Sequence, residues 1–174
     1  MARQARPGSV RHAAQVSWES VFEAEYSELV RFCALLTGSR DVAEDLAQDC
    51  FVRIAPHLEK LEEAKAKYYL RRTAVNTWRS RVRRLSLERR KARAHALPVS
   101  DPHEAIDNSD LITRALVTLP ARQRACLILK YYDDMSDSQA AFALGVSVGT
   151  IKSQCSRGLG RLRKEIENGA RRTA

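Results

Sequence analysis

Residues 136–155 carry the sequence SDSQAAFALGVSVGTIKSQC, which holds the signals for two short helices and a tight turn between them. Ser136 and Gln139 form a capping box, in which each side chain satisfies a backbone N–H at the start of a helix. Gly145 stands where the chain must turn with a positive φ, and Ser147 is a second N-cap. These signals predict a helix-turn-helix, whose second helix enters the major groove of DNA.

The apolar positions predict which side of each helix is buried. In the first helix we expect Ala140, Ala141, Phe142 and Leu144 to face the core. In the second helix the inner stripe is Val148, Ile151, Cys155, Leu159 and Leu162. The outer face carries groups suited to phosphates and base edges, and we expect it to contact DNA through Thr150, Lys152, Ser153, Ser156 and Arg157. The alternative is a plain helical hairpin with a solvated basic face.

Two glycines interrupt the second helix. Gly158 and Gly160 would each cost about 1 kcal/mol in a helix interior. Either they allow close packing against a neighbouring helix, or the helix weakens at this point.

Apolar residues at helical spacing also fill the rest of the chain, and strict β alternation is absent. One stripe begins at Trp18 and ends at Gly38, and a second helix should begin near Asp41. A third helix should run from about Ala64 to Arg84. Two more are expected on either side of Leu119-Pro120. The predicted fold class is all-α, with two small helical domains joined by a flexible linker.

The domain organisation follows from changes in composition. We expect a disordered basic tail over residues 1–17, a first helical domain over 18–90 and a second over 111–165. Residues 91–110 contain two prolines and no sustained apolar period, which predicts a linker. Residues 166–174 form a C-terminal tail.

The composition narrows the functional classes. The chain has 174 residues, of which 44% are hydrophobic, enough to build a core and to exclude wholesale disorder. No run of residues is long and apolar enough for a membrane span or a signal peptide. We therefore expect a cytoplasmic protein with no membrane insertion. The 30 Lys and Arg residues against 21 Asp and Glu give a net charge of +9, which favours an anionic partner such as nucleic acid.

The charge is arranged in blocks. Residues 19–63 hold 11 acidic and 4 basic residues, whereas residues 64–93 hold 12 basic residues and one acidic residue, Glu88. The 17 residues from 94 to 110 hold four acids and no Lys or Arg, and residues 111–174 hold 11 basic and 5 acidic residues. A merely solvated surface would mix the two signs. The pattern predicts two basic surfaces for nucleic acid and one acidic surface for a different partner.

No residues suggest catalysis. Cys33, Cys50, Cys126 and Cys155 are widely spaced within apolar patterns, which predicts buried free thiols. The four histidines are scattered, and neither a metal-ligand or triad spacing nor a glycine-rich phosphate loop occurs. We expect no enzyme, no cofactor, no metal and no small-molecule substrate.

Three motifs resemble those of bacterial sigma factors. Residues 45–54, DLAQDCFVRI, resemble the segment that binds core RNA polymerase, and residues 69–78, YLRRTAVNTW, resemble the promoter-opening segment. Residues 145–153, GVSVGTIKS, and the preceding Leu119-Pro120 resemble the region that binds the minus-35 element. The short linker and the lack of further domains resemble the organisation of the extracytoplasmic-function (ECF) group. The residues of the motifs resemble those of its actinobacterial sigma-E-like subset.

The resemblance implies a role for each surface. Core polymerase would be bound by Asp45, Gln48, Asp49, Phe51 and Arg53. The minus-10 element would be bound by Arg72, Asn76, Arg79, Arg83 and Arg84, with Asn76 capturing an unstacked base. Arg71 and Arg72 would support strand opening electrostatically, and Trp78 is expected in the core. The minus-35 element would be bound by the outer face of the helix after Ser147.

The predicted function is that of an alternative sigma factor, which directs core RNA polymerase to particular promoters. The implied partners are core RNA polymerase, promoter DNA and an anti-sigma factor. The alternative is a stand-alone helix-turn-helix transcriptional regulator. A regulator would bind its operator tightly by itself, whereas a sigma factor would act only together with core polymerase.

Overall fold

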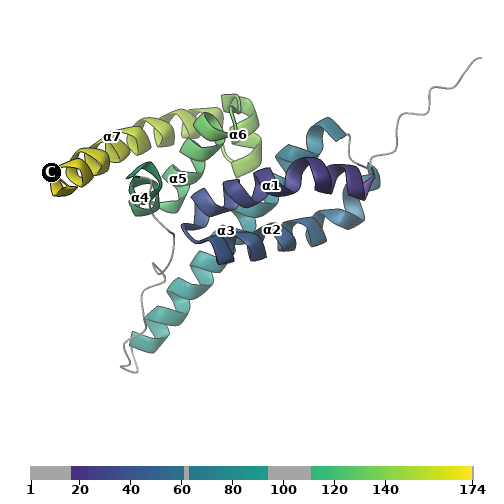
Figure 1. The fold of residues 1–174 in the computed structure, drawn as a ribbon, viewed down its shortest axis with the longest axis horizontal. Coiled ribbons are helices and arrows are strands. Elements are labelled where there is room, and N and C mark those ends of the chain that lie inside the picture. The colour runs from purple at the N-terminus through teal and green to yellow at the C-terminus, as the bar shows by residue number, and fades with distance from the viewer. Residues whose placement is uncertain (1–16, 61–62, 94–110, 174) are drawn as a thin grey trace, which may run out of the picture.

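The computed structural model describes residues 17–60, 63–93 and 111–173, and in these ranges it contains helices and no strand. The first group of helices is α1 (Trp18–Thr37), α2 (Arg40–Ile54), the 3-10 helix η1 (Ala55–Lys60) and α3 (Glu63–Arg93). The second group is α4 (Leu111–Thr118), α5 (Ala121–Leu127), the π-helix η2 (Ile128–Tyr132), α6 (Asp137–Leu144) and α7 (Val148–Thr173). The predicted all-α class is confirmed (Figure 1). The expected N-terminal tail and most of the expected linker lie outside the described residues.

Glycine and serine set the turn between α1 and α2. Gly38 adopts φ 79°, a left-handed conformation that favours glycine, and its N–H donates to the Ala34 carbonyl at 2.8 Å. Ser39 then caps α2 by accepting a hydrogen bond from the Val42 N–H. The chain therefore reverses at the predicted place, and α2 packs along α1.

The third helix is longer than predicted. We expected it to end near Arg84, but α3 continues to Arg93. Residues 85–93 are mostly Leu, Glu, Arg, Lys and Ala, which are good helix formers, and the next proline is Pro98. The end of α3 projects beyond the other helices (Figure 1), and its residues 83–88 are exposed.

The first group of helices encloses an apolar core. Leu29, Phe32, Leu46, Phe51 and Leu70 are among its fully buried side chains and come from all three α-helices. Each such side chain contributes about 1.5–3 kcal/mol when it is removed from water. This burial holds α3 against the α1–α2 pair and so fixes the direction in which its outer face points.

The helix-turn-helix forms as predicted. Ser136 accepts a hydrogen bond from the Gln139 N–H at 3.2 Å, and the Gln139 side chain accepts one from the Ser136 N–H at 2.8 Å. Gly145 has φ 62° and ends α6. Ser147 accepts a hydrogen bond from the Thr150 N–H at 3.2 Å at the start of α7. The capping box, the turn and the second cap are all confirmed.

The prediction of which residues of this motif face the core is partly wrong. Phe142 is 46% exposed, and Val148 and Leu159 are also exposed, whereas Ile151 and Cys155 are buried as expected. The actual inner face of α6 is made of small residues, Ala140, Ala141 and Ala143, with Leu144. Phe142 instead points toward α3, where its ring meets Tyr69 edge-on.

The two groups of helices contact one another. Helix α6 packs against α3, and α1 packs against α4, η2 and α5. Buried apolar residues of both groups belong to one continuous cluster. The two predicted helical domains are present in the described residues, and the second packs against the first.

Candidate nucleic-acid interface

Helix α2 presents one polar face outside the core. Asp45, Gln48 and Asp49 recur at helical spacing and are exposed or half-buried, and Arg53 continues the same face. Asp49 is held by an ion pair with Arg81 of α3, whose Nη2 lies 2.5 Å from Oδ2. The predicted acidic face is therefore present, and one of its acids is joined to the basic helix.

Phe51 does not belong to this face, contrary to the prediction. Its ring is buried and meets three aromatic rings of α1, those of Trp18, Phe22 and Tyr26, at centroid distances of 5.5, 5.0 and 5.9 Å. A side chain with no exposed surface cannot contact a partner directly. Phe51 anchors α2 to α1 and so positions the polar face.

Val52 is a surface residue that the prediction missed. It is 72% exposed and lies at helical spacing from Asp45, Gln48 and Asp49. An apolar side chain surrounded by charged ones is typical of the centre of a protein–protein interface. The helical period could have identified it, since position 52 follows 45, 48 and 49 around the same face.

The outer face of α3 carries an amide and several guanidinium groups. Asn76, Arg79 and Arg83 line a shallow hollow of about 890 Å³, which is closed on the other side by Arg122 of α5. Asn76 and Arg83 are exposed. Among the described residues, the three arginines make no ion pair with an acid. The hollow is therefore positively charged and open to an anion.

Two further arginines of α3 already have partners. Arg84 lies 3.7 Å from Glu88, an exposed pair one helical turn away. Arg72 places its guanidinium 4.8 Å from the centre of the Phe142 ring, a cation–π contact with α6. The five predicted minus-10 residues thus share one helix, but Arg72 faces the second group of helices.

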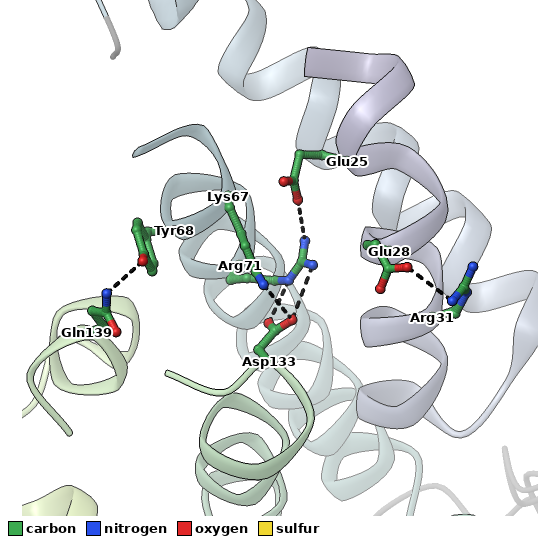
Figure 2. Close-up of polar contacts among 8 residues, drawn as sticks. All are labelled: Glu25, Glu28, Arg31, Lys67, Tyr68, Arg71, Asp133 and Gln139. Atoms are coloured by element: carbon green, nitrogen blue, oxygen red, sulfur yellow. Dashed lines mark hydrogen bonds and ion pairs between the residues drawn. The ribbon is translucent and has the colours of Figure 1, made fainter. Parts of the chain in front are cut away.

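Arg71 is fully buried and is not available to DNA in this arrangement, which corrects the role expected for it. Its Nε donates to Asp133 Oδ2 at 2.7 Å and its Nη2 to Asp133 Oδ1 at 3.3 Å. Glu25 of α1 lies 3.6 Å from the same guanidinium, and Lys67 lies 3.5 Å from Asp133 (Figure 2). Burial raises the pKa of Glu25, and the nearby Arg71 partly opposes this shift.

A second buried arginine, Arg124, also joins the two groups of helices. Its guanidinium donates to the carbonyl oxygens of Leu36 in α1, Val117 and Leu119 at 2.8, 2.7 and 3.2 Å. Burial lowers the pKa of this arginine to about 10. Nothing in the local sequence distinguishes Arg124 from a surface arginine, so only the structure identifies it.

Trp78 packs against the core, as predicted. Tyr69 is half-buried and lies between the core and Phe142. Both aromatic residues of this segment are thus partly covered.

Helix α7 presents the predicted outer face. Lys152, Ser156 and Arg157 are exposed, and Thr150 and Ser153 are half-buried. The Ser153 hydroxyl donates to the Thr150 carbonyl at 3.0 Å, and the Thr150 hydroxyl lies 2.9 Å from that of Ser147. Lys152 and Arg157 are therefore accessible to a partner, whereas the Thr150 and Ser153 hydroxyls are held close to the helix.

The cysteines are buried and free, as predicted. Burial raises the pKa of the Cys50 and Cys126 thiols to about 12, so both remain protonated at neutral pH. Within the described ranges no three His, Cys, Asp or Glu side chains are placed to hold a metal ion. No described helix is long and apolar enough to cross a membrane.

Taken together, these features define a class of protein, namely an all-helical DNA-binding protein with one helix-turn-helix and a second basic helix. Comparison with known proteins identifies the family. Residues 21–88 match Sigma-70 region 2, and residues 109–162 match Sigma-70 region 4. The chain belongs to the sigma-70 family of RNA polymerase sigma factors and is of the ECF type.

Individual relatives support this assignment. The RNA polymerase sigma-E factor of Streptomyces avermitilis is 32% identical over 165 residues, covering 90% of this chain and 89% of that protein. The RNA polymerase sigma-E factor of Streptomyces coelicolor is 34% identical over 156 residues, which cover 82% of this chain and 86% of that protein. The ECF sigma factor SigE of Mycolicibacterium smegmatis is 28% identical and covers 93% of this chain and 66% of that protein.

Solved structures agree with the fold. The sigma factor RpoE of Bartonella quintana, solved with the anti-sigma factor NepR, is 25% identical, with a TM-score of 0.71 over 86% of this chain and 96% of that chain. CnrH, solved with the cytosolic domain of CnrY, has a TM-score of 0.62 at 19% identity, and the match covers 90% of this chain and 91% of that chain. The predicted function, an alternative sigma factor that directs transcription initiation, is confirmed, and no finding supports a stand-alone regulator.

Proposed function

We propose that this sigma factor divides its work between its two groups of helices. Residues 18–90 would bind core RNA polymerase and the minus-10 element, and residues 111–165 would bind the minus-35 element. The observation that carries the proposal is that each matched sigma region presents its own outward basic helix face, on α3 and on α7. Both faces lie outside the apolar core, so nucleic acid can approach without unfolding either group.

The polar face of α2 would bind core polymerase. Asp45, Gln48, Asp49 and Arg53 supply the charged rim, and Val52 supplies an exposed apolar centre. Interfaces of this kind gain affinity from a buried apolar anchor, while the surrounding charges guide encounter and orientation. Phe51 supports this surface from beneath through its aromatic contacts with α1.

The outer face of α3 would bind the minus-10 element. The amide of Asn76 carries both a donor and an acceptor, so it can recognise the edge of an unstacked base. Arg79, Arg83 and Arg84 would hold phosphates of the duplex and of the opened strand. Arg72 would join them once its contact with Phe142 is released.

The outer face of α7 would lie in the major groove at the minus-35 element. Lys152 and Arg157 are exposed cations at the N-terminal half of a helix that follows a tight turn, the position from which a recognition helix contacts DNA. Thr150, Ser153 and Ser156 would contribute short polar contacts to phosphates or base edges.

An anti-sigma factor is the third proposed partner. Two proteins of similar fold, RpoE of Bartonella quintana and CnrH, were solved in complex with NepR and with the cytosolic domain of CnrY. We expect a regulator of this class to bind the present chain too. Because core polymerase and promoter DNA share the bacterial cytoplasm, we place the protein there.

Transcription with purified components tests the proposal. The full chain is mixed with core RNA polymerase and a library of genomic promoter fragments, and the transcripts are sequenced. We expect a defined set of start sites that requires both components. Absence of any transcript that depends on the chain would contradict the proposal.

Variants at exposed positions then separate the three surfaces. Val52→Asp should weaken binding to core polymerase, and Asn76→Ala should lower transcription from duplex promoters. Lys152→Ala and Arg157→Ala should each weaken binding to the minus-35 element and reduce the salt slope of binding by about 1. Arg114→Ala, an exposed arginine of α4 outside these surfaces, is the matched control and should change none of them. Equal effects of Arg114→Ala and Arg157→Ala would contradict the assignment of α7.

A further inference from the structure

A hollow between α3 and α5 brings together three cationic side chains from the two groups of helices. Arg79 and Arg83 of α3 line one side, and Arg122 of α5 lines the other. The volume of the hollow is about 890 Å³, which is in the range of pockets that hold small molecules. Among the described residues, no acid lines the hollow and none of the three arginines forms an ion pair. The described part of this hollow therefore lacks a counter-charge of its own.

Two other hollows of the described chain contain cations whose charge is balanced within the hollow itself. In the hollow beside α1 and α2, Arg40 lies 3.1 Å from Glu44. In the hollow beside η2 and α7, Lys130 lies 2.9 Å from Asp137. The hollow between α3 and α5 has no such pair among the described residues, so an external anion would supply the balancing charge.

The arrangement of the three arginines is suited to linked phosphates. Arg79 and Arg83 are one helical turn apart on α3, a like-charge spacing that destabilises a helix and that a bound anion would relieve. Each guanidinium presents a planar fork of donors that fits two phosphate oxygens at once. Arg122 adds a third fork from α5. Three bidentate contacts occupy more oxygen atoms than a single phosphate carries, so a chain of phosphates fits the three arginines better.

The remainder of the hollow is suited to a nucleoside. Val82 is half-buried and Leu87 is 49% exposed, and both contribute an apolar part of the wall. The Asn76 amide offers both donors and an acceptor, the combination that matches the edge of a nucleobase. Ser80 and Ser86 add hydroxyl groups that can bind a ribose. From Asn76 to Leu87 the lining extends for about 16 Å along α3, which leaves room for a base as well as for phosphates.

We propose that this hollow binds a nucleoside polyphosphate, whose phosphates are held by Arg79, Arg83 and Arg122 and whose base lies against Val82 and Leu87. The inference goes beyond the proposed function, because the ligand is a free nucleotide and its binding requires neither promoter DNA nor polymerase. Arg122 distinguishes this site from the proposed minus-10 face, which lies on α3 alone. Arg79 and Arg83 would serve both sites.

Titration calorimetry on the full chain tests the proposal without DNA or polymerase. The probes are ATP, GTP and inorganic tripolyphosphate, which has linked phosphates but no base, in a magnesium-free buffer. We expect saturable binding of at least one nucleoside triphosphate, at least about fivefold tighter than that of tripolyphosphate. The affinity should fall as the salt concentration rises, because charges open to solvent are screened. Absence of saturable binding would overturn the proposal, as would equal affinities for the nucleotides and for tripolyphosphate.

Arginine variants locate the binding site. Arg122→Ala removes one fork and should weaken nucleotide binding by about tenfold or more. Arg114→Ala removes the same charge from an exposed position of α4 outside the hollow, and it should change the affinity by less than about twofold. Arg122→Lys keeps the charge without the fork, so its affinity should lie between those of the parent protein and Arg122→Ala. Equal losses in Arg122→Ala and Arg114→Ala would show only general attraction to a basic protein and would contradict the site.

A leucine variant separates the base from the phosphates. Leu87→Ala shortens an exposed apolar side chain and should weaken binding of the nucleoside triphosphate by about threefold, while the affinity for tripolyphosphate stays the same. Leu85→Ala, at a similarly exposed leucine of α3 outside the hollow, is the matched control and should change neither affinity. Equal changes for both probes in Leu87→Ala would contradict the placement of the base. Absence of nucleotide binding contradicts this inference alone, whereas absence of polymerase-dependent transcription contradicts the proposed function alone.

Discussion

Arg71 and Arg72 are neighbours in the sequence and carry the same charge, yet their environments differ completely. Arg71 is buried between Glu25 and Asp133, whereas Arg72 is half-buried and lies against Phe142. Consecutive residues of a helix point about 100° apart, so one faces the interior and the other faces α6. The +11 charge block over residues 64–93 therefore overstates the positive surface available to DNA, because part of it is neutralised inside the protein.

Gly158 and Gly160 form a natural pair for a test at the residue scale. A Cβ on Gly158 would lie 3.2 Å from Leu127 Cδ1 and Cγ, whereas a Cβ on Gly160 would meet nothing within 4 Å. Gly160→Ala should therefore stabilise the protein by about 0.5–1 kcal/mol through helix propensity. The free energy of unfolding of Gly158→Ala should be lower than that of Gly160→Ala by at least about 1 kcal/mol, because the new methyl group overpacks the α5–α7 contact.

Urea unfolding of the full chain measures both glycine variants. Equal stabilisation by the two substitutions would show that Leu127 moves aside freely. The two possibilities left open by the sequence are thus separated: Gly158 allows close packing, and Gly160 only weakens the helix.

At the scale of elements, local signals determined where helices begin and end. Gly38, Ser136, Gly145 and Ser147 all act at the predicted places. The error was α3, which continues to Arg93 because no local signal stops it. The sides of helices were harder to predict than their ends. Val148, Leu159 and Phe142 are exposed, since burial depends on which neighbour covers each face.

The capping box of α6 can be tested by a matched pair of serine variants. Ser136→Ala removes the acceptor for the Gln139 N–H and should lower the free energy of unfolding by about 1 kcal/mol. Ser138 is exposed in the same first turn and caps nothing, so Ser138→Ala should change stability by less than about 0.5 kcal/mol. Thermal unfolding followed by circular dichroism compares them. A loss of the same size in both variants would contradict the cap.

At the scale of the whole molecule, the two groups of helices share a buried polar contact. Glu25, Arg71 and Asp133 come from three distant segments, and Arg124 adds hydrogen bonds to the α1 and α4 ends. In this arrangement the proposed minus-10 helix, α3, packs against α6 of the helix-turn-helix. The arrangement also places a titratable carboxyl at the junction.

Glu25 should make stability depend on pH in a defined sense. Burial raises its pKa above the ordinary 4.5, with Arg71 and Lys67 opposing and Asp133 and Glu28 adding to the shift. The folded protein thus binds this proton more tightly than the unfolded chain does. The contribution of this proton to the free energy of unfolding is fully present below pH 4.5 and is lost as the pH rises through the raised pKa.

Glu25→Gln removes that titration. Urea unfolding at a series of pH values measures the free energy of unfolding of both proteins. As the pH rises above 4.5, the parent protein should lose stability relative to the variant. Glu23→Gln, the same substitution at an exposed neighbour on α1, is the matched control for the change from Glu to Gln. A pH-independent difference for Glu25→Gln would contradict the raised pKa.

The sequence by itself determined the all-α class, the helix-turn-helix and the family motifs, because caps, turn glycines and helical periods act over a few residues. It also placed the polar face of α2 and the basic faces of α3 and α7. Only the tertiary structure decided that Phe51 supports the polar face of α2 from beneath, that Val52 is exposed within that face, and that Arg71 and Arg124 are buried. Those outcomes depend on contacts between residues far apart in the chain, such as Arg71 with Asp133, and no local pattern records which distant side chain will cover a given charge.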